Sequence, residues 1–232
     1  MTENFRQFFR AAILLLAIAA SMTAVAGGDF PGQEPSRRVM KAQEKADSLF
    51  EKGDYERAIF IYREELAPLG DKYAQYMIGF MHLTGKGVAQ DFVSASAWYR
   101  LAAERGHEAF SGARDEVMSM LNDDQQTRSD DAYLKLRHEL SDATLLSALI
   151  REDLDVLRRF TGSNPEIAGS LRDSFDARKH AYEPVAERLQ QRLDYLIDLS
   201  LSEEFDSATE QHSLNMLEAE VIREIRAFAV AR

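Results

Sequence analysis

The sequence predicts an all-α protein in which a short array of helical hairpins is followed by a C-terminal helical segment. The main support is an internal repeat with an offset of 37 residues, because Asp54–Ala58 (DYERA) matches Asp91–Ala95 (DFVSA) and Tyr62-Arg63 matches Tyr99-Arg100 without a gap. A period of this size leaves room for two helices and two turns per unit. No proline lies between residues 75 and 163, so helices can run through the middle of the chain.

Residues 1–26 are predicted to be a secretory signal peptide. Two arginines precede an uncharged apolar run, and the small residues of Ala24-Val25-Ala26 form a cleavage site. The alternative is an inner-membrane anchor that is not cleaved, because the charge-free residues 11–28 would span roughly 27 Å as a helix, close to the thickness of a bilayer core. Residues 27–37 carry glycine, proline and polar residues and are expected to form a flexible linker.

The composition limits which cellular compartment and which class of partner are expected. The chain has no cysteine, which rules out disulfides, thiolate metal ligands and a cysteine nucleophile. Small secreted domains of higher cells usually need disulfides, so a bacterial periplasm is the expected location. The net charge is −11, and removal of the leader (Arg6 and Arg10 against Glu3, or +1) leaves −12. Nucleic acid is therefore not an expected partner, since phosphate binding needs clustered lysine and arginine.

The repeat unit from Ala74 to Gly106 shows its two helices most clearly. In the first helix, Gly79 lies on the side of the apolar residues and allows a neighbouring helix to approach closely. The Gly85-Lys86-Gly87 turn ends this helix, and Asp91 is placed to cap the second one, which Gly106 stops. The second helix alternates small and large residues suited to interlocking packing, namely Ala95, Trp98, Tyr99, Ala102 and Ala103.

This pattern resembles the Sel-one-like repeat, a relative of the tetratricopeptide repeat, with the order AxxxxGxxYxxGxGVxxDxxxAxxWYxxAAxxG. The matching positions are Ala74, Gly79, Gly85, Gly87, Val88, Asp91, Ala95, Trp98, Tyr99, Ala102, Ala103 and Gly106. His82 stands where the family usually has tyrosine, which changes a helix contact. The preceding unit looks like a plain tetratricopeptide motif, and the following GHEAFSGARDEVMSML resembles the closing half-repeat of exported members. The resemblance covers roughly residues 41–121 and implies a right-handed superhelical array that binds proteins and is not itself an enzyme.

The resemblance also implies a partner-binding groove, because in this family the first helices of the hairpins line a concave surface. The corresponding residues here are Gln43, Asp47, Glu51, Tyr73, Tyr76, Phe80, Thr84, Ser111 and Asp115. An acidic rim beside aromatic faces would suit an extended protein segment that carries some lysine or arginine. The alternative is that Tyr76 and Phe80 are buried against flanking helices.

A capping helix is predicted after the repeats. Asn122 and Gln125 have the spacing of a capping box, so a helix should start there, run to about Leu140 and cover the last repeat. The repeat array with its cap is thus expected over residues 38–141.

Residues 142–232 are expected to form a C-terminal helical region. Apolar residues recur at helical spacing in three stretches: Leu146, Leu149, Ile150, Leu154, Leu157 and Phe160; Val185, Leu189, Leu193 and Leu196; Leu214, Leu217, Val221, Ile225 and Phe228. The later helices could form a hairpin packed on the repeats, which is the favoured interpretation, or a seam for self-association into a homodimer.

No catalytic, metal or cofactor site emerges from the sequence. The five histidines are scattered, no serine lies in a nucleophile elbow, and Gly85-Lys86-Gly87 lacks the spacing of a phosphate loop. The favoured function is a periplasmic protein-binding scaffold. The alternatives are a structural envelope component that oligomerises through its C-terminal helices, and a cell-wall glycosidase, which would need a carboxyl group with a raised pKa in a cleft.

Overall fold

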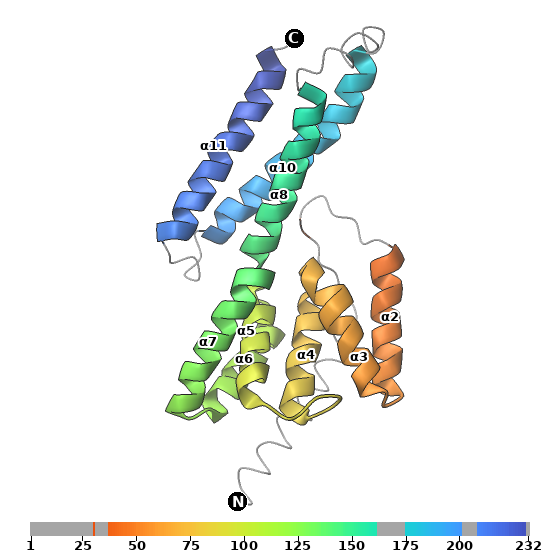
Figure 1. The fold of residues 1–232 in the computed structure, drawn as a ribbon, viewed down its shortest axis with the longest axis vertical. Coiled ribbons are helices and arrows are strands. Elements are labelled where there is room, and N and C mark those ends of the chain that lie inside the picture. The colour runs from red at the N-terminus through yellow and green to blue at the C-terminus, as the bar shows by residue number, and fades with distance from the viewer. Residues whose placement is uncertain (1–29, 31–36, 162–174, 201–207, 231–232) are drawn as a thin grey trace, which may run out of the picture. The chain divides into compact units, whose positions relative to one another are not determined.

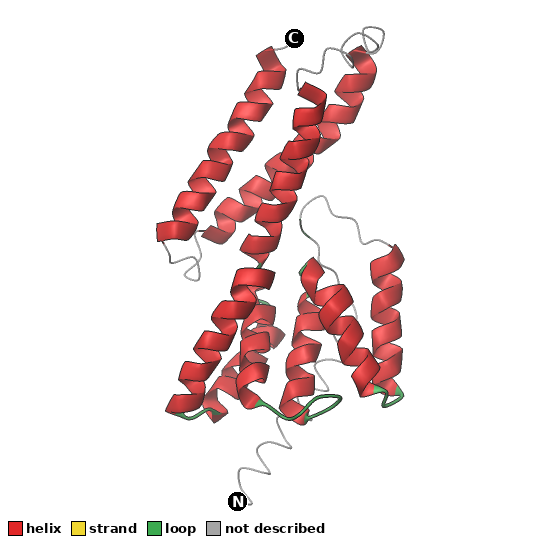
Figure 2. Cartoon of the chain, in the orientation of Figure 1, coloured by secondary structure: helices red, strands yellow, loops and turns green. Residues whose placement is uncertain are grey.

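The computed structural model describes Phe30 and residues 37–161, 175–200 and 208–230, and this part of the chain is all-α (Figure 2). Within these ranges every helix is too short or too polar to cross a membrane. The predicted signal peptide lies outside them. Of the expected linker, the structure describes Phe30, which is buried, and Arg37, which begins the first labelled helix. The helical part of the chain divides into two compact units after Leu145, and Phe30 belongs to the second unit.

The first unit contains a structural repeat that matches the repeat in the sequence. Helices α2 (Arg37–Glu51) and α3 (Tyr55–Ile61) form one hairpin, and α4 (Lys72–Thr84) and α5 (Phe92–Ala102) form the next (Figure 1). The second helices of the two hairpins begin 37 residues apart, each directly after an aspartate. The all-α repeat architecture is therefore confirmed.

The turns of the second hairpin follow the expected chemistry. Oδ1 of Asp91 accepts a hydrogen bond from the Val93 N–H at 3.0 Å and caps α5. Gly85 ends α4 in the left-handed region with φ +70°, which glycine adopts without the penalty that other residues pay. After α5, a short 3-10 turn (Ala103–Arg105) ends at Gly106. The first hairpin differs, because α3 continues through a π-helical turn (Tyr62–Leu66) and a 3-10 turn (Ala67–Leu69).

Two further helices complete the array. Helix α6 (Glu108–Met120) follows Gly106, and α7 (Asp123–Leu140) begins at a complete capping box, in which Asn122 and Gln125 each accept the other's backbone N–H. Helix α7 packs on α5, where Ser129 donates a hydrogen bond to Ser96 at 2.9 Å and Arg100 lies over the ring of Tyr133. The capping helix thus has the predicted bounds and covers α5.

A buried ionic cluster joins the first residue of α8 to the repeat. Nζ of Lys72, at the start of α4, lies 2.7 Å from Oε2 of Glu104 and 2.9 Å from Oδ1 of Asp142. Nε of Arg105 donates to Oδ2 of Asp142 at 2.7 Å, and the same guanidinium donates to the Gly70 carbonyl. These residues come from three separate stretches of chain, so the cluster joins the starts of α4 and α8 to the turn that follows α5.

The second unit, from Leu146 onward, contains most of α8 (Asp142–Thr161) together with α10 (Phe175–Ser200) and α11 (Ala208–Val230). The buried residues are Leu146, Ile150, Leu154, Leu157, Leu189, Leu193, Leu196, Leu214, Leu217 and Val221. Asp153 of α8 pairs with Arg188 at 2.6 Å and with Arg192 at 2.7 Å, both on α10. The predicted apolar faces therefore contribute to the interior of this unit. The side chains of Phe160 and Phe228 lie outside the described part.

Candidate binding surface

The groove expected from the sequence lies on the first helix of each hairpin, which the structure identifies as α2, α4 and α6. On α2, Gln43 and Asp47 are partly buried and Glu51 is exposed. On α6, Ser111 is partly buried and Asp115 is exposed. These polar positions are accessible to a partner to different degrees, and Glu51 and Asp115 are the most exposed.

The aromatic part of the expected groove is corrected by the structure. Tyr73, Tyr76 and Phe80 are all buried in the core. The ring of Tyr76 lies between those of Tyr99 and Phe110, with centroid distances of 5.2 and 5.3 Å. A partner cannot contact these rings in this conformation, so the alternative of burial against flanking helices holds. Thr84 uses its hydroxyl locally, donating to the Phe80 carbonyl at 2.8 Å.

Asp47 is joined to two tyrosines that sequence reasoning had not connected. Its Oδ1 accepts a hydrogen bond from the Tyr62 hydroxyl at 2.5 Å, and Tyr73 also bonds to this carboxylate. Burial raises the pKa of Asp47, although both hydroxyl donors oppose the shift. Burial also raises the pKa of each tyrosine. The cluster therefore links α2 to the second hairpin and leaves Asp47 only partly available to a ligand.

Lys86 lies over three aromatic rings at the turn of the second hairpin. Its Nζ is 5.0 Å from the ring centroids of Phe50 and Tyr55 and 5.4 Å from that of Phe80. An ammonium over ring faces at these distances is attracted to their negative electrostatic potential. The turn that follows α4 is thereby attached to the first hairpin.

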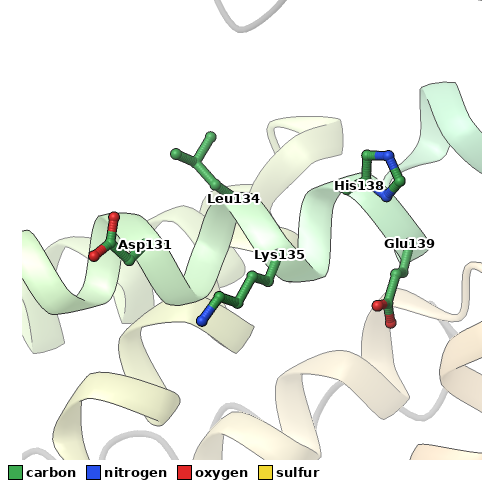
Figure 3. A pocket seen from close by; sticks show the side chains of 5 residues that line it. All are labelled: Asp131, Leu134, Lys135, His138 and Glu139. Carbon is green, nitrogen blue, oxygen red and sulfur yellow. The ribbon is translucent and has the colours of Figure 1, made fainter.

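A groove between α5 and α7 was not expected from the sequence. Its lining combines apolar side chains with charges: Val93, Ser94, Ala97, Trp98, Arg128, Asp131, Ala132, Lys135, Leu136 and Glu139. The volume is about 460 Å³. A second shallow pocket shares three of these residues and extends along α7 to Leu134 and His138 (Figure 3).

Leu134 is the signal that could have indicated this surface. It is 56% exposed on a helix whose other outward positions are polar, and Figure 3 shows it directed away from the side of α7 that carries Lys135 and Glu139. A leucine at that position has no role in the packing of a simple capping helix. The exposed leucine therefore marks this side of α7 as a candidate contact surface.

The comparison with protein families decides the nature of the central hairpin. The Sel1 repeat model matches residues 72–107, which span α4, the Gly85–Gly87 turn, α5 and its stop at Gly106. The chain contains a Sel1 repeat. No curated protein and no solved structure matches the chain.

Sel1 repeats generally mediate protein–protein interactions, and proteins that carry them are typically non-enzymatic scaffolds. Within the described ranges, no group of three His, Asp or Glu side chains could hold a metal ion. The surface of the Sel1 repeat and its neighbours carries charges, apolar side chains and hydrogen-bonding groups.

Proposed function

We propose that the chain is an exported protein-binding scaffold that holds a segment of a partner protein in the periplasm. The observation that carries this proposal is the Sel1 repeat at residues 72–107, a type of unit that generally mediates protein–protein interactions. The N-terminal leader predicted from the sequence supports export. The buried core beneath the repeat supports a preformed surface, since a rigid scaffold loses little conformational freedom when it binds.

The proposed contact region is an acidic surface on the helices that precede and follow the Sel1 repeat. It is defined by Asp47 and Glu51 of α2 and Asp115 of α6. Because Tyr76 and Phe80 are buried, recognition there depends on charge and hydrogen bonding. A partner segment with lysine or arginine complements these carboxylates, and charge complementarity contributes to specificity and to the association rate.

Capture of a partner from an envelope extract tests this function. We expect the wild-type chain to retain one stoichiometric protein and the Glu51→Lys/Asp115→Lys variant to lose it. The matched control is Asp194→Lys/Asp198→Lys, which makes the same change in net charge at exposed positions of α10. Binding should weaken with added salt, because exposed charges are screened. Equal capture by the two variants would remove the acidic surface from the proposal, and no capture by the wild type would contradict the scaffold.

Export is tested separately by expressing the full chain and fractionating the cells. We expect the protein in the periplasmic fraction with Gly27 as its first residue, which intact mass measures directly. A membrane-bound product that retains the leader would support the anchored alternative. Recovery in the cytoplasm would contradict export.

A further inference from the structure

One side of α7 carries exposed side chains that lie outside its buried contact with α5. Ser129 and Tyr133 are buried on the side that faces α5, whereas the opposite side is exposed. We call the following exposed residues the outer face of α7: Arg128, Asp131, Leu134, Lys135, His138 and Glu139. Four of them, Arg128, Asp131, Lys135 and Glu139, also line the rim of the groove between α5 and α7. Figure 3 shows Leu134 and His138 on one flank of this face and Lys135 and Glu139 on the other.

The charges of the outer face alternate in sign along the helix. Arg128, Asp131, Lys135 and Glu139 give plus, minus, plus and minus over about three turns. Asp131 and Glu139 each lie four residues from Lys135, a spacing at which helical ion pairs form. Among the described residues, however, none of these three side chains makes an ion pair. Arg128 lies 4.0 Å from Asp124 in an exposed pair. The charges of Asp131, Lys135 and Glu139 are therefore available to a ligand that carries the complementary order.

A second copy of α7, running antiparallel, carries that order. In an antiparallel pair with a two-fold axis, a residue that precedes the axis faces one that follows it by the same number of positions. With the axis beside Leu134, Arg128 faces Glu139 of the second copy, and Asp131 comes within about one residue rise, 1.5 Å, of Lys135. Symmetry makes each of these pairs twice. A parallel arrangement would instead place each charge opposite itself.

The exposed leucine fits the same arrangement. Leu134 lies about half a residue from the two-fold axis, so it meets Leu134 of the second copy at the centre of the contact. Both leucines lie on the same flank because rotation about this axis preserves the lateral position. The two leucines then meet on one flank of the contact, while Lys135 and Glu139 lie on the other flank.

We propose that the outer face of α7 is a homodimer interface in which two copies of the chain pack their α7 helices antiparallel. This inference does not depend on the acidic surface, which lies on α2 and α6. A single helix face is at the small end of stable interfaces, so the dimer forms at high protein concentration. Its consequence is that two repeat units are linked, which increases the apparent affinity for a partner with repeated segments.

Charge reversal at the outermost pair tests this geometry by sedimentation equilibrium on the protein purified from cells that express the full chain. Arg128→Glu and Glu139→Arg each place like charges opposite one another twice, and each variant should lose at least tenfold in dimer association. An equimolar mixture of the two variants should form a heterodimer, because every opposed pair is again attractive. The double variant Arg128→Glu/Glu139→Arg should dimerise by itself. Lys45→Glu, at an exposed position of α2, is the control for a change in net charge.

Each outcome bears on the proposal. A wild-type chain that stays monomeric at the highest concentration overturns it, as does a dimer that single reversals leave unchanged. Loss in both single variants without recovery in the mixture shows a general charge effect and also overturns it. An unchanged melting temperature confirms that each variant is folded. Because partner capture is measured separately, failure of this dimer leaves the scaffold function standing.

Discussion

Gly79 lies directly against the ring of Tyr99: a Cβ atom on Gly79 would stand 3.1 Å from Cδ1 and 3.2 Å from Cε1 of that ring. It would also lie 3.3 Å from the backbone oxygen of Ala95. These contacts are tighter than ordinary packing distances, so α4 and α5 approach as closely as they do because position 79 has no side chain.

We expect Gly79→Val to lower the free energy of unfolding by about 1–3 kcal/mol, because the added methyl groups overpack the contact with Tyr99. Gly112→Val is the matched control, since a Cβ there meets no heavy atom within 4 Å. The control should change stability by less than about 1 kcal/mol. Urea unfolding at neutral pH measures both, and equal effects at the two positions would contradict close helix pairing at Gly79.

Among the turn glycines, Gly87 is the one whose substitution should lower the free energy of unfolding most. It has φ +73°, and a Cβ atom would stand 2.5 Å from the carbonyl carbon of Tyr55 and 2.6 Å from its oxygen. Gly53 has a similar φ of +81° but open space around it. Gly53→Ala should therefore lower the free energy of unfolding only by the penalty for placing alanine in the left-handed conformation, about 1–2 kcal/mol. We expect Gly87→Ala to exceed that by at least about 1 kcal/mol in the same unfolding experiment, since backbone must move. Equal costs would show that the turn shifts freely away from α3.

Local signals in the sequence were sufficient to predict the ends of helices. Asp91 and the Asn122–Gln125 capping box start helices where expected, and Gly85 ends one, because each acts on backbone groups within four residues. The family pattern adds Gly79, whose role follows from close helix packing. The caps and turns depend on residues that are close in the sequence, whereas the role of Gly79 was indicated by the family pattern, because its contact with Tyr99 joins two helices.

The face that α4 presents was not predictable in the same way. Tyr73, Tyr76 and Phe80 suit either an aromatic groove or a core, since their rings are apolar and two of them carry a hydroxyl. The better guide was that α4 is apolar nearly all around, which is typical of a buried helix. The ionic cluster is even harder to predict from the sequence, because Lys72 and Asp142 are 70 residues apart and no local pattern connects them.

Replacing Phe80 tests whether its ring belongs to the core, as the structure shows, or to the groove that the sequence predicted. Phe80 is 2% exposed and its ring lies 6.0 Å from that of Phe50, so Phe80→Ala should destabilise the chain by about 3–5 kcal/mol. Phe60→Ala is the control, since Phe60 is 56% exposed, and it should cost less than about 1 kcal/mol. If Phe80→Ala instead keeps full stability and loses partner capture, the ring belongs to the groove after all.

Lys86 should stabilise the turn through its charge. Lys86→Gln keeps much of the side-chain length but removes the ammonium from the three rings, so we expect a loss of about 0.5–2 kcal/mol. Lys52→Gln, at an exposed position, removes a lysine charge elsewhere and should have an effect within about 0.5 kcal/mol. Thermal or urea unfolding of the two variants side by side measures the difference. Equal stability in both would contradict a contribution from the ring contacts.

Asp142 and Glu104 share Lys72, yet their pKa values shift in opposite directions. Burial alone would raise the pKa of Asp142, but Lys72 and Arg105 hold it below its usual value of 3.8. Glu104 contacts only one of these cations and faces the charge of Asp142, so burial raises its pKa above 4.5. The number of cations around each carboxylate explains the difference.

Removing the Asp142 charge should therefore be costly at neutral pH. Asp142→Asn leaves Arg105 without its carboxylate and Lys72 with Glu104 alone, and we expect a loss of about 3 kcal/mol in the free energy of unfolding. Glu64→Gln is the control, because Glu64 pairs with Arg63 at an exposed site and should change stability by less than about 1 kcal/mol.

The pH dependence of this loss has a definite sign. The pKa of Asp142 is lower in the folded chain than in the unfolded chain, so the unfolded chain binds more protons below pH 3.8. The contribution of Asp142 is complete above that pH and is lost as the pH falls through its lowered pKa. Because the charge of Asp142 also raises the pKa of Glu104, the comparison is made with Glu104→Gln in both chains. Urea unfolding of Glu104→Gln with and without Asp142→Asn from pH 7 to pH 3 should show a constant difference at first and a shrinking one below pH 3.8. A difference that grows on acidification would mean that the carboxyl group is protonated in the folded chain, contrary to its pairing with Lys72 and Arg105.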